Sequence, residues 1–186
     1  MSSPPRTSVA VWPAGIRILH AALILSVLVS TLALFGPVEW HQPAGYAAAA
    51  VVALRTIWGL LAAPRTSALR FSSFVKSPGS TLAYARLLLQ RREPRYIGHN
   101  PLGGWMVLAL LGCVAGLACT GWLYTTDLLW GDPTVEQLHL GLAWALAVLV
   151  VLHLAGVIFT SWRQRENLVR AMLTGRKRPP TGHDLI

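Results

Sequence analysis

Residues 138–162 read LHLGLAWALAVLVVLHLAGVIFTSW, 25 consecutive positions without an acidic side chain, a lysine or an arginine. About 20 such residues are enough for a helix to cross the hydrocarbon core of a bilayer. The stretch also carries two histidines, His139 and His153. Ionisable side chains inside a membrane are costly and usually mark a functional site. The segment therefore predicts a transmembrane helix that takes part in function.

Three more apolar segments are long enough to span a membrane, at about 13–35, 43–63 and 102–124. Proline-containing breaks separate the four segments, and Thr134 is the expected N-cap of the last one, at about 138–162. The predicted fold is all-α, an integral membrane four-helix bundle, in a single domain over residues 1–186.

The composition supports a membrane protein and disfavours a soluble one. Of the 186 residues, 54% are hydrophobic and only 12% charged, whereas a soluble domain has roughly 25% charged residues. The formal net charge of +9 would suggest nucleic acid binding in a soluble protein. Here the charges lie between the apolar segments, so membrane topology explains them and no nucleic acid partner is needed.

The distribution of positive charge predicts the orientation. Of the 16 Lys and Arg residues, 15 lie in the N-terminal segment up to Arg17, in the 64–100 loop or in the 163–186 tail, and Arg55 lies well inside a span. Because cytoplasmic loops are enriched in Lys and Arg, both termini are expected in the cytoplasm, with the chain in the bacterial cytoplasmic (inner) membrane. A signal peptide over residues 1–35 is the alternative, but the apolar run is too long and lacks a clear cleavage site.

Depth sorts four of the six histidines into two pairs. His139 and His153 are 14 residues apart, so they share one helix face and differ in height by about 21 Å. In the predicted orientation His20 and His153 lie towards the inner surface, and His41 and His139 towards the outer surface. Four unrelated structural histidines are the alternative interpretation.

Two imidazoles that face each other across a helix bundle are suited to be the axial ligands of a haem iron. The sequence contains no Cys-x-x-Cys-His, which excludes covalent c-type attachment. The two pairs therefore predict two b-type haems. Cys113 and Cys119 cannot face each other on one helix and are expected to be small packing residues. Gly112 and Gly116 are expected to allow the close approach of a flat ring or of another helix backbone.

The chain resembles the prokaryotic di-haem cytochrome b family, which includes cytochrome b-561 and the membrane cytochrome subunits of nickel–iron hydrogenases and formate dehydrogenases. The similarity extends over nearly the whole chain. It rests on His41-x-x-x-Gly45-Tyr46, Leu54-Arg55-Thr56-Ile57-Trp58-Gly59, Gly98-His99-Asn100-Pro101-Leu102-Gly103-Gly104, His139 with His153-x-x-Gly156, and the tail Glu166-Asn167-Leu168-Val169-Arg170-Ala171-Met172.

The resemblance implies that His20, His41, His139 and His153 are the haem ligands. It also implies electron transfer between quinone and a redox partner protein, such as a cytochrome c or a dehydrogenase subunit. Resemblance to the formate dehydrogenase subunits suggests a quinone site at His99 and Asn100. Helix capping by Asn100 and a loop role for His99 are the alternatives.

Two arginines are candidates to bind haem propionates. Arg55 lies within the second span at a depth comparable to that of His153, and a buried cation needs an anionic partner. Arg17 lies one turn before His20. For both, the alternative is an arginine that extends to the membrane surface. His183, in the polar tail, has no predicted role.

The loop at 64–100 is not expected to form a domain. Leucines and arginines between Leu82 and Arg92 suggest a short interfacial helix, which lies on the membrane or covers the inner haem.

Two bis-histidine haems leave no open coordination position, which favours electron transfer over oxygen chemistry at the iron. A self-contained oxidoreductase that moves electrons between superoxide and quinone is the first alternative. Acidic outer loops, which would repel an anion, count modestly against it. A haem-free four-span scaffold is the second alternative. The sequence does not decide whether the chain is itself an enzyme.

Overall fold

The computed structural model describes residues 8–61, 70–181 and 184–185. The first part of the predicted 64–100 loop and His183 lie outside the described residues. The elements, in chain order, are β1 (Val9–Ala10), α1 (Ala14–Leu32), the 3-10 helices η1 (Ala33–Phe35) and η2 (Val38–Trp40), α2 (His41–Leu61), α3 (Phe71–Phe74), α4 (Pro78–Leu89), α5 (Pro101–Leu123), α6 (Pro133–Gln164), α7 (Leu168–Thr174) and β2 (Arg176–Lys177).

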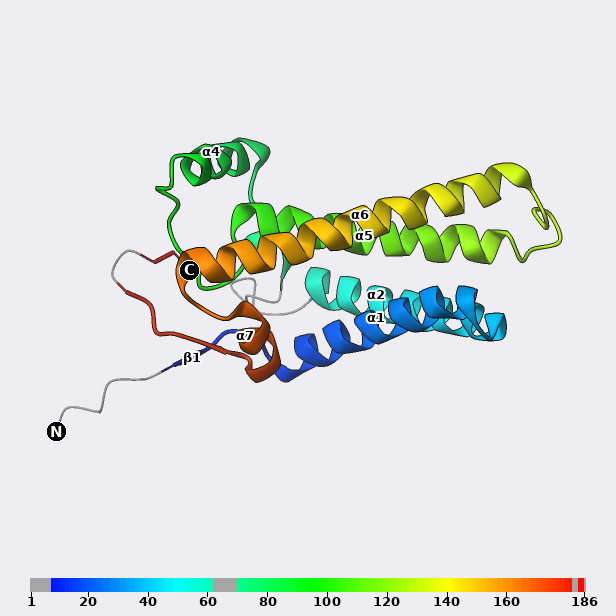
Figure 1. The fold of residues 1–186 in the computed structure, drawn as a ribbon, viewed down its shortest axis with the longest axis horizontal. Coiled ribbons are helices and arrows are strands. Elements are labelled where there is room, and N and C mark those ends of the chain that lie inside the picture. The colour runs from blue at the N-terminus through cyan, green and yellow to red at the C-terminus, as the bar shows by residue number, and fades with distance from the viewer. Residues whose placement is uncertain (1–7, 62–69, 182–183, 186) are drawn as a thin grey trace. The chain divides into compact units, whose positions relative to one another are not determined.

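Four helical segments are long and apolar enough to cross a membrane, which confirms the four predicted spans (Figure 1). They are Ala14–Phe35, Val38–Leu61, Pro101–Leu123 and Pro133–Gln164. The last begins five residues earlier than the sequence predicts. The prediction that Thr134 is the N-cap was wrong, because the Asp132 carboxylate accepts hydrogen bonds from the backbone N–H groups of Thr134 (2.8 Å) and Val135 (3.1 Å).

The described chain divides into two compact units, which are described separately. The helical unit comprises residues 18–58 and 107–153, and the terminal unit comprises the described residues before 18, between 59 and 106, and after 153. Each of the four long helices contributes residues to both units.

The helical unit holds two antiparallel helix pairs, α1 with α2 and α5 with α6. Its core consists of Ala48 and Val52 on α2 and Val114 on α5, and apolar side chains from α1, α5 and α6 pack against the core, namely Leu23, Val27, Leu111 and Leu146. Small residues such as Ala48 let the helices approach closely where there is no hydrophobic effect to drive association.

Small residues also determine the contact between α5 and α6. A Cβ atom added at Gly116 would lie 3.1 Å from the Leu142 side chain, whereas one added at Gly112 would meet nothing within 4 Å. The Cys113 thiol lies 3.3 Å from the Leu142 carbonyl oxygen, as a weak hydrogen bond. Gly116 and Cys113 therefore serve helix packing, as the sequence predicts for both.

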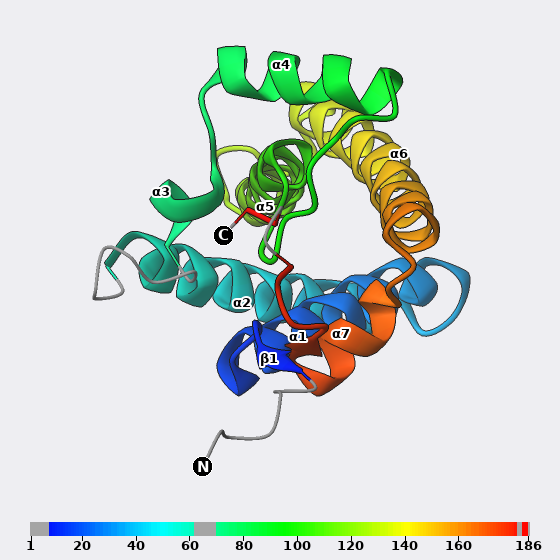
Figure 2. The ribbon, with the colours of Figure 1, turned by 90° about the vertical axis from the view of Figure 1, so that its left-hand side faces the viewer.

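Segments near the two ends of the chain pair in the terminal unit, where β1 is antiparallel to β2, with Val9 opposite Lys177 and Ala10 opposite Arg176 (Figure 2). The C-terminal part approaches β1 through Gly175, which ends α7 in the left-handed conformation with a φ of 76°. A Cβ atom at this position would lie 2.5 Å from the Trp12 carbonyl oxygen. Glycine is needed here both for its backbone conformation and for the close approach.

The helix predicted between Leu82 and Arg92 exists as α4, which Ser77 caps by accepting a hydrogen bond from the Ser80 N–H (3.3 Å). Leu82 and Leu89 are exposed on it. Its location at the membrane interface stays a prediction.

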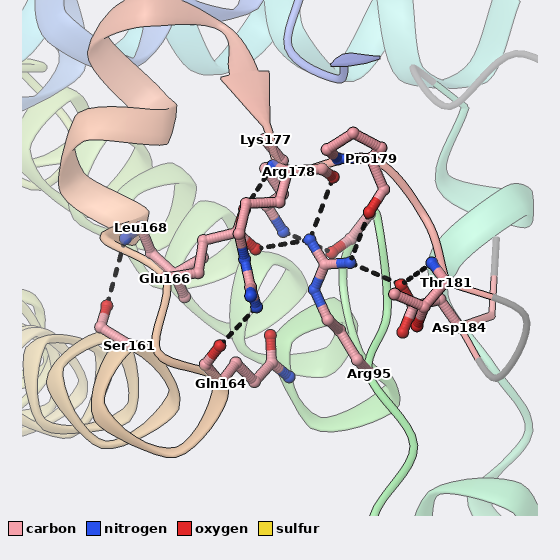
Figure 3. A network of polar contacts seen from close by, with 11 residues as sticks. Arg95, Ser161, Gln164, Glu166, Leu168, Lys177, Arg178, Pro179, Thr181 and Asp184 are labelled. Carbon is pink, nitrogen blue, oxygen red and sulfur yellow. Dashed lines mark hydrogen bonds and ion pairs between the residues drawn. The ribbon is translucent and has the colours of Figure 1, made fainter. Parts of the chain in front are cut away.

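A network of charged side chains ties the 64–100 loop to the C-terminal tail in the terminal unit (Figure 3). Arg95 forms ion pairs with Glu166 (2.8 Å) and Asp184; Glu166 is buried, and Arg95 and Asp184 are half-buried. Glu166 also accepts a hydrogen bond from the Arg178 N–H (2.6 Å), and Asp184 accepts one from the Thr181 N–H (2.8 Å). The tail is thus held by charge-assisted hydrogen bonds to a single arginine.

This network is expected to fail in acid. Burial raises the pKa of Glu166, but the hydrogen bonds from Arg178 and Arg95 and the nearby positive charges outweigh that effect, so the pKa is lowered overall. A carboxylate whose pKa is lower in the folded state stabilises the fold at pH values above its pKa in the unfolded chain, about 4.3. This stabilisation is lost as the pH falls through the pKa of the folded state. Hydrogen-exchange protection of the Arg178 amide should therefore be constant from pH 7 to 5 and fall below about pH 4. Unchanged protection down to pH 3 would contradict this account.

Candidate haem site

His41 is the first residue of α2, and its ring is oriented by α1. Its Nδ1 atom lies 2.8 Å from the backbone carbonyl oxygen of Ser30. A carbonyl oxygen can only accept, so Nδ1 carries the proton and donates it. The other ring nitrogen, Nε2, is then unprotonated and has its lone pair available for a metal. Metal-binding histidines commonly have their second nitrogen engaged in this way.

His139, on the first turns of α6, is oriented by α5 in the same manner. Its Nδ1 lies 2.9 Å from the Thr120 hydroxyl oxygen. That hydroxyl donates its only hydrogen to the carbonyl oxygen of Gly116 (2.9 Å) or of Leu117 (3.2 Å). The hydroxyl then accepts from the His139 Nδ1–H, and the Leu117 carbonyl oxygen is a second acceptor for the His139 ring. Nε2 of His139 is left as the unprotonated nitrogen, as in His41.

The separation of these two rings matches a haem iron held between them. Their centroids are 6.2 Å apart and their planes are inclined by 69°. Two metal–imidazole bonds of about 2 Å, plus roughly 1 Å from each nitrogen to its ring centre, give about 6 Å. On the face of α2 that carries His41, a Cβ atom added at Gly45 would meet nothing within 4 Å. The residues present therefore fit a bis-histidine haem.

His20 on α1 and His153 on α6 lie close enough for an electrostatic interaction between their rings. Both are half-buried in the helical unit. The structure thus brings together the same two pairs that depth alone predicts, His41 with His139 and His20 with His153.

The two candidate propionate ligands have different surroundings. Arg55 is half-buried on α2 in the helical unit, and its Nη1 atom is fully buried. Arg17 belongs to the terminal unit, where its Nη2 donates to the carbonyl oxygen of Leu173. Arg17 thus has a structural contact with α7, while Arg55 lies in the same unit as the four histidines.

His99 and Asn100, predicted as a quinone site, are packed within the terminal unit. The His99 ring lies between Trp12 (4.7 Å between centroids) and Phe74 (4.5 Å). The Asn100 side chain accepts a hydrogen bond from the Gly103 N–H (2.7 Å) and so caps α5. Both residues therefore have the structural roles that the sequence allowed as alternatives.

Tyr84 on α4 also contacts this cluster through a hydrogen bond with Asn100. Burial and the nearby Glu93 and Tyr96 raise the pKa of Tyr84 to about 12, although the Asn100 hydrogen bond opposes this. Tyr84 therefore stays protonated at neutral pH and can act as a hydrogen-bond donor.

Thr120 and Ser30 are site residues that the sequence analysis missed. Thr120 is 5% exposed within an apolar helix, and a buried hydroxyl inside a span is a signal of internal hydrogen bonding. Ser30 contacts His41 through its backbone carbonyl oxygen (2.8 Å), which no sequence pattern reveals, and through its hydroxyl (3.2 Å).

Among the described residues, no group of three or more His, Cys, Asp or Glu side chains is arranged to hold a metal ion. A bis-histidine haem needs only two protein ligands, so a pair is the relevant unit.

A family model described as prokaryotic cytochrome b561 matches residues 11–175. The chain belongs to the prokaryotic cytochrome b561 family. No curated protein and no solved structure matches it significantly. As a member of this family the chain is a multi-pass bacterial membrane protein of the haem b type that functions in electron transfer. The predicted family and the all-α membrane fold are confirmed, and a haem-free scaffold is no longer supported.

Proposed function

We propose that this cytochrome b561 family member holds two haem b groups and transfers electrons across the bilayer, between the quinone pool and a redox partner protein. His41 and His139 bind the outer haem, and His20 and His153 bind the inner one. Both termini face the cytoplasm, as the distribution of Lys and Arg favours, and the membrane is the cytoplasmic one.

The observation that carries this proposal is the geometry of the outer pair. The two rings are 6.2 Å apart, and both Nδ1 atoms bind protein acceptors. Each residue therefore presents Nε2 as the ligand. When bound, a haem with two histidine ligands supplies one-electron transfer without an open position for oxygen.

The spacing on α6 supports transfer over much of the membrane thickness. His139 and His153 lie on one uninterrupted helix, and 14 residues at about 1.5 Å each separate them by about 21 Å. Arg55 is the proposed partner of a haem propionate, because a buried guanidinium in a span is stabilised by a carboxylate. Arg17 is the second candidate for that role.

We assign the quinone site to the opening of α5, at His99 and Asn100, on the strength of the family resemblance. A quinone carbonyl needs a hydrogen-bond donor and a source of protons. The Asn100 oxygen accepts from the Gly103 N–H, so the donors that we assign to the quinone carbonyl are the Asn100 amide NH₂ group and the His99 imidazole.

Haem reduction by quinol tests this function. Purified protein mixed with a short-chain quinol in a stopped-flow instrument should develop the α-band of reduced haem b, and a quinone-site inhibitor should slow it. A self-contained superoxide:quinone oxidoreductase would instead be reduced by superoxide at a comparable rate without a protein partner. Reduction by neither donor would overturn the proposed link to quinone.

A further inference from the structure

We propose that Thr120 is a positioning residue that orients His139 and lowers the reduction potential of the outer haem. This inference rests on the proposed function, since it concerns how the chain adjusts a haem bound by His41 and His139.

The hydrogen bonds around Thr120 form a directed chain. The His139 Nδ1–H donates to the Thr120 hydroxyl oxygen (2.9 Å), and that hydroxyl donates to the Gly116 carbonyl oxygen (2.9 Å). A hydroxyl that donates to a carbonyl becomes a better acceptor, because linked hydrogen bonds polarise each other. Thr120 is 5% exposed, so water cannot easily replace it as the acceptor.

The neighbouring residue fixes the same ring from a second direction. A Cβ atom added at Gly121 would lie 3.3 Å from Cε1 and 3.7 Å from Nδ1 of His139. The imidazole thus lies against the backbone at Gly121 while Thr120 holds its Nδ1. Together these contacts restrict both the position and the rotation of the ligand.

A hydrogen bond that draws on the Nδ1 proton makes the imidazole more basic. A more basic ligand stabilises ferric over ferrous iron, and hydrogen bonding around the ligands is one of the means by which proteins adjust haem potentials. For His41 the nearer acceptor is the Ser30 backbone carbonyl (2.8 Å), which a side-chain substitution cannot remove, and the Ser30 hydroxyl lies farther from the same Nδ1 atom (3.2 Å). Thr120, at 2.9 Å from the His139 Nδ1, is therefore the side chain with the shorter hydrogen bond to a ligand histidine.

The test is a redox titration of the purified holoprotein and of Thr120→Val, which keeps the shape of the side chain but removes the acceptor. The outer haem of Thr120→Val should titrate at a higher midpoint potential than in the original protein, while the inner haem stays unchanged. Thr120→Ser should restore the original value. Affinity for the outer haem should fall about 10- to 100-fold in Thr120→Val.

Thr31→Val controls for the loss of a hydroxyl within a span. It removes a hydroxyl that donates to its own helix, at the Val27 carbonyl oxygen (2.8 Å). This variant should leave the outer midpoint potential unchanged.

An unchanged outer midpoint potential in Thr120→Val, with both haems bound, would overturn the inference. So would an equal shift of both haems, which indicates a general structural effect. If Thr120→Val lost the outer haem, Thr120→Cys, with a weaker sulfur acceptor, should still show an intermediate upward shift, and no shift would refute the role. Absence of haem from the protein without substitutions would instead refute the proposed function.

Discussion

Replacing His139 by alanine should remove one of two haems from the purified protein and leave the other with an unaltered spectrum. Without His139 the outer haem retains only His41 as a ligand, because the two rings face each other as a pair. The inner pair, His20 and His153, does not share a ligand with it. Haem content per chain, measured as the pyridine haemochrome, should fall by half.

Replacing His153 by alanine should remove the other haem, and the double variant His139→Ala/His153→Ala should contain none. His99→Ala is the matched control, since His99 packs between Trp12 and Phe74 rather than beside another histidine. Its haem content should equal that of the original protein. Loss of both haems in His139→Ala with the helices intact would contradict two independent pairs.

Replacing Arg95 by methionine should destabilise the terminal unit by about 1–2 kcal/mol, less than is typical for a fully buried ion pair, because solvent screens part of this network. The Arg95 and Glu166 side chains are 12% and 5% exposed, so the substitution leaves the carboxylates of Glu166 and Asp184 without their guanidinium. Thermal unfolding followed by tail proteolysis should report this as earlier cleavage after residue 166.

Arg86→Met is the control, because Arg86 is exposed on α4, and its effect should stay within about 0.5 kcal/mol. Combining Arg95→Met with Glu166→Gln should cost less than the sum of the single changes, because both members of one pair are then neutral. Equal effects of Arg95→Met and Arg86→Met would show that the network does not hold the tail.

The spans and the histidine pairs could be predicted from the sequence because both depend on local rules. A run of about 20 apolar residues is long enough to cross a bilayer, and helical geometry fixes the relative height and face of His139 and His153. The predicted pairs agree with the ring contacts of His41 with His139 and the proximity of His20 to His153.

The hydrogen bonds that orient the ligands could not be predicted in the same way. Thr120 and His139 lie on different helices, and their contact depends on how α5 and α6 pack around Leu142. The shorter contact of Ser30 with His41 uses a backbone atom, whose position does not depend on the residue type. At the start of α6, the carboxylate of Asp132 caps the helix because it precedes Pro133 directly, which moves the cap two residues from the predicted Thr134.

The terminal network is the largest feature that sequence reasoning missed. Arg95 and Glu166 are 71 residues apart, and a pairing over that distance has no periodicity to reveal it. In the sequence, Arg95 and the other arginines of the 64–100 loop indicate only membrane orientation. The structure shows that Arg95 also binds the C-terminal tail. One residue can thus serve both topology and folding.

The central claim, two bis-histidine haem b groups per chain, is tested most directly by counting haem. Pyridine haemochrome and protein concentration, measured on the purified original protein together with a reduced-minus-oxidised spectrum, should give two b-type haems per chain, both low-spin. Folded protein with one haem would contradict the second pair, and folded protein with none after expression with ample haem would contradict the account as a whole.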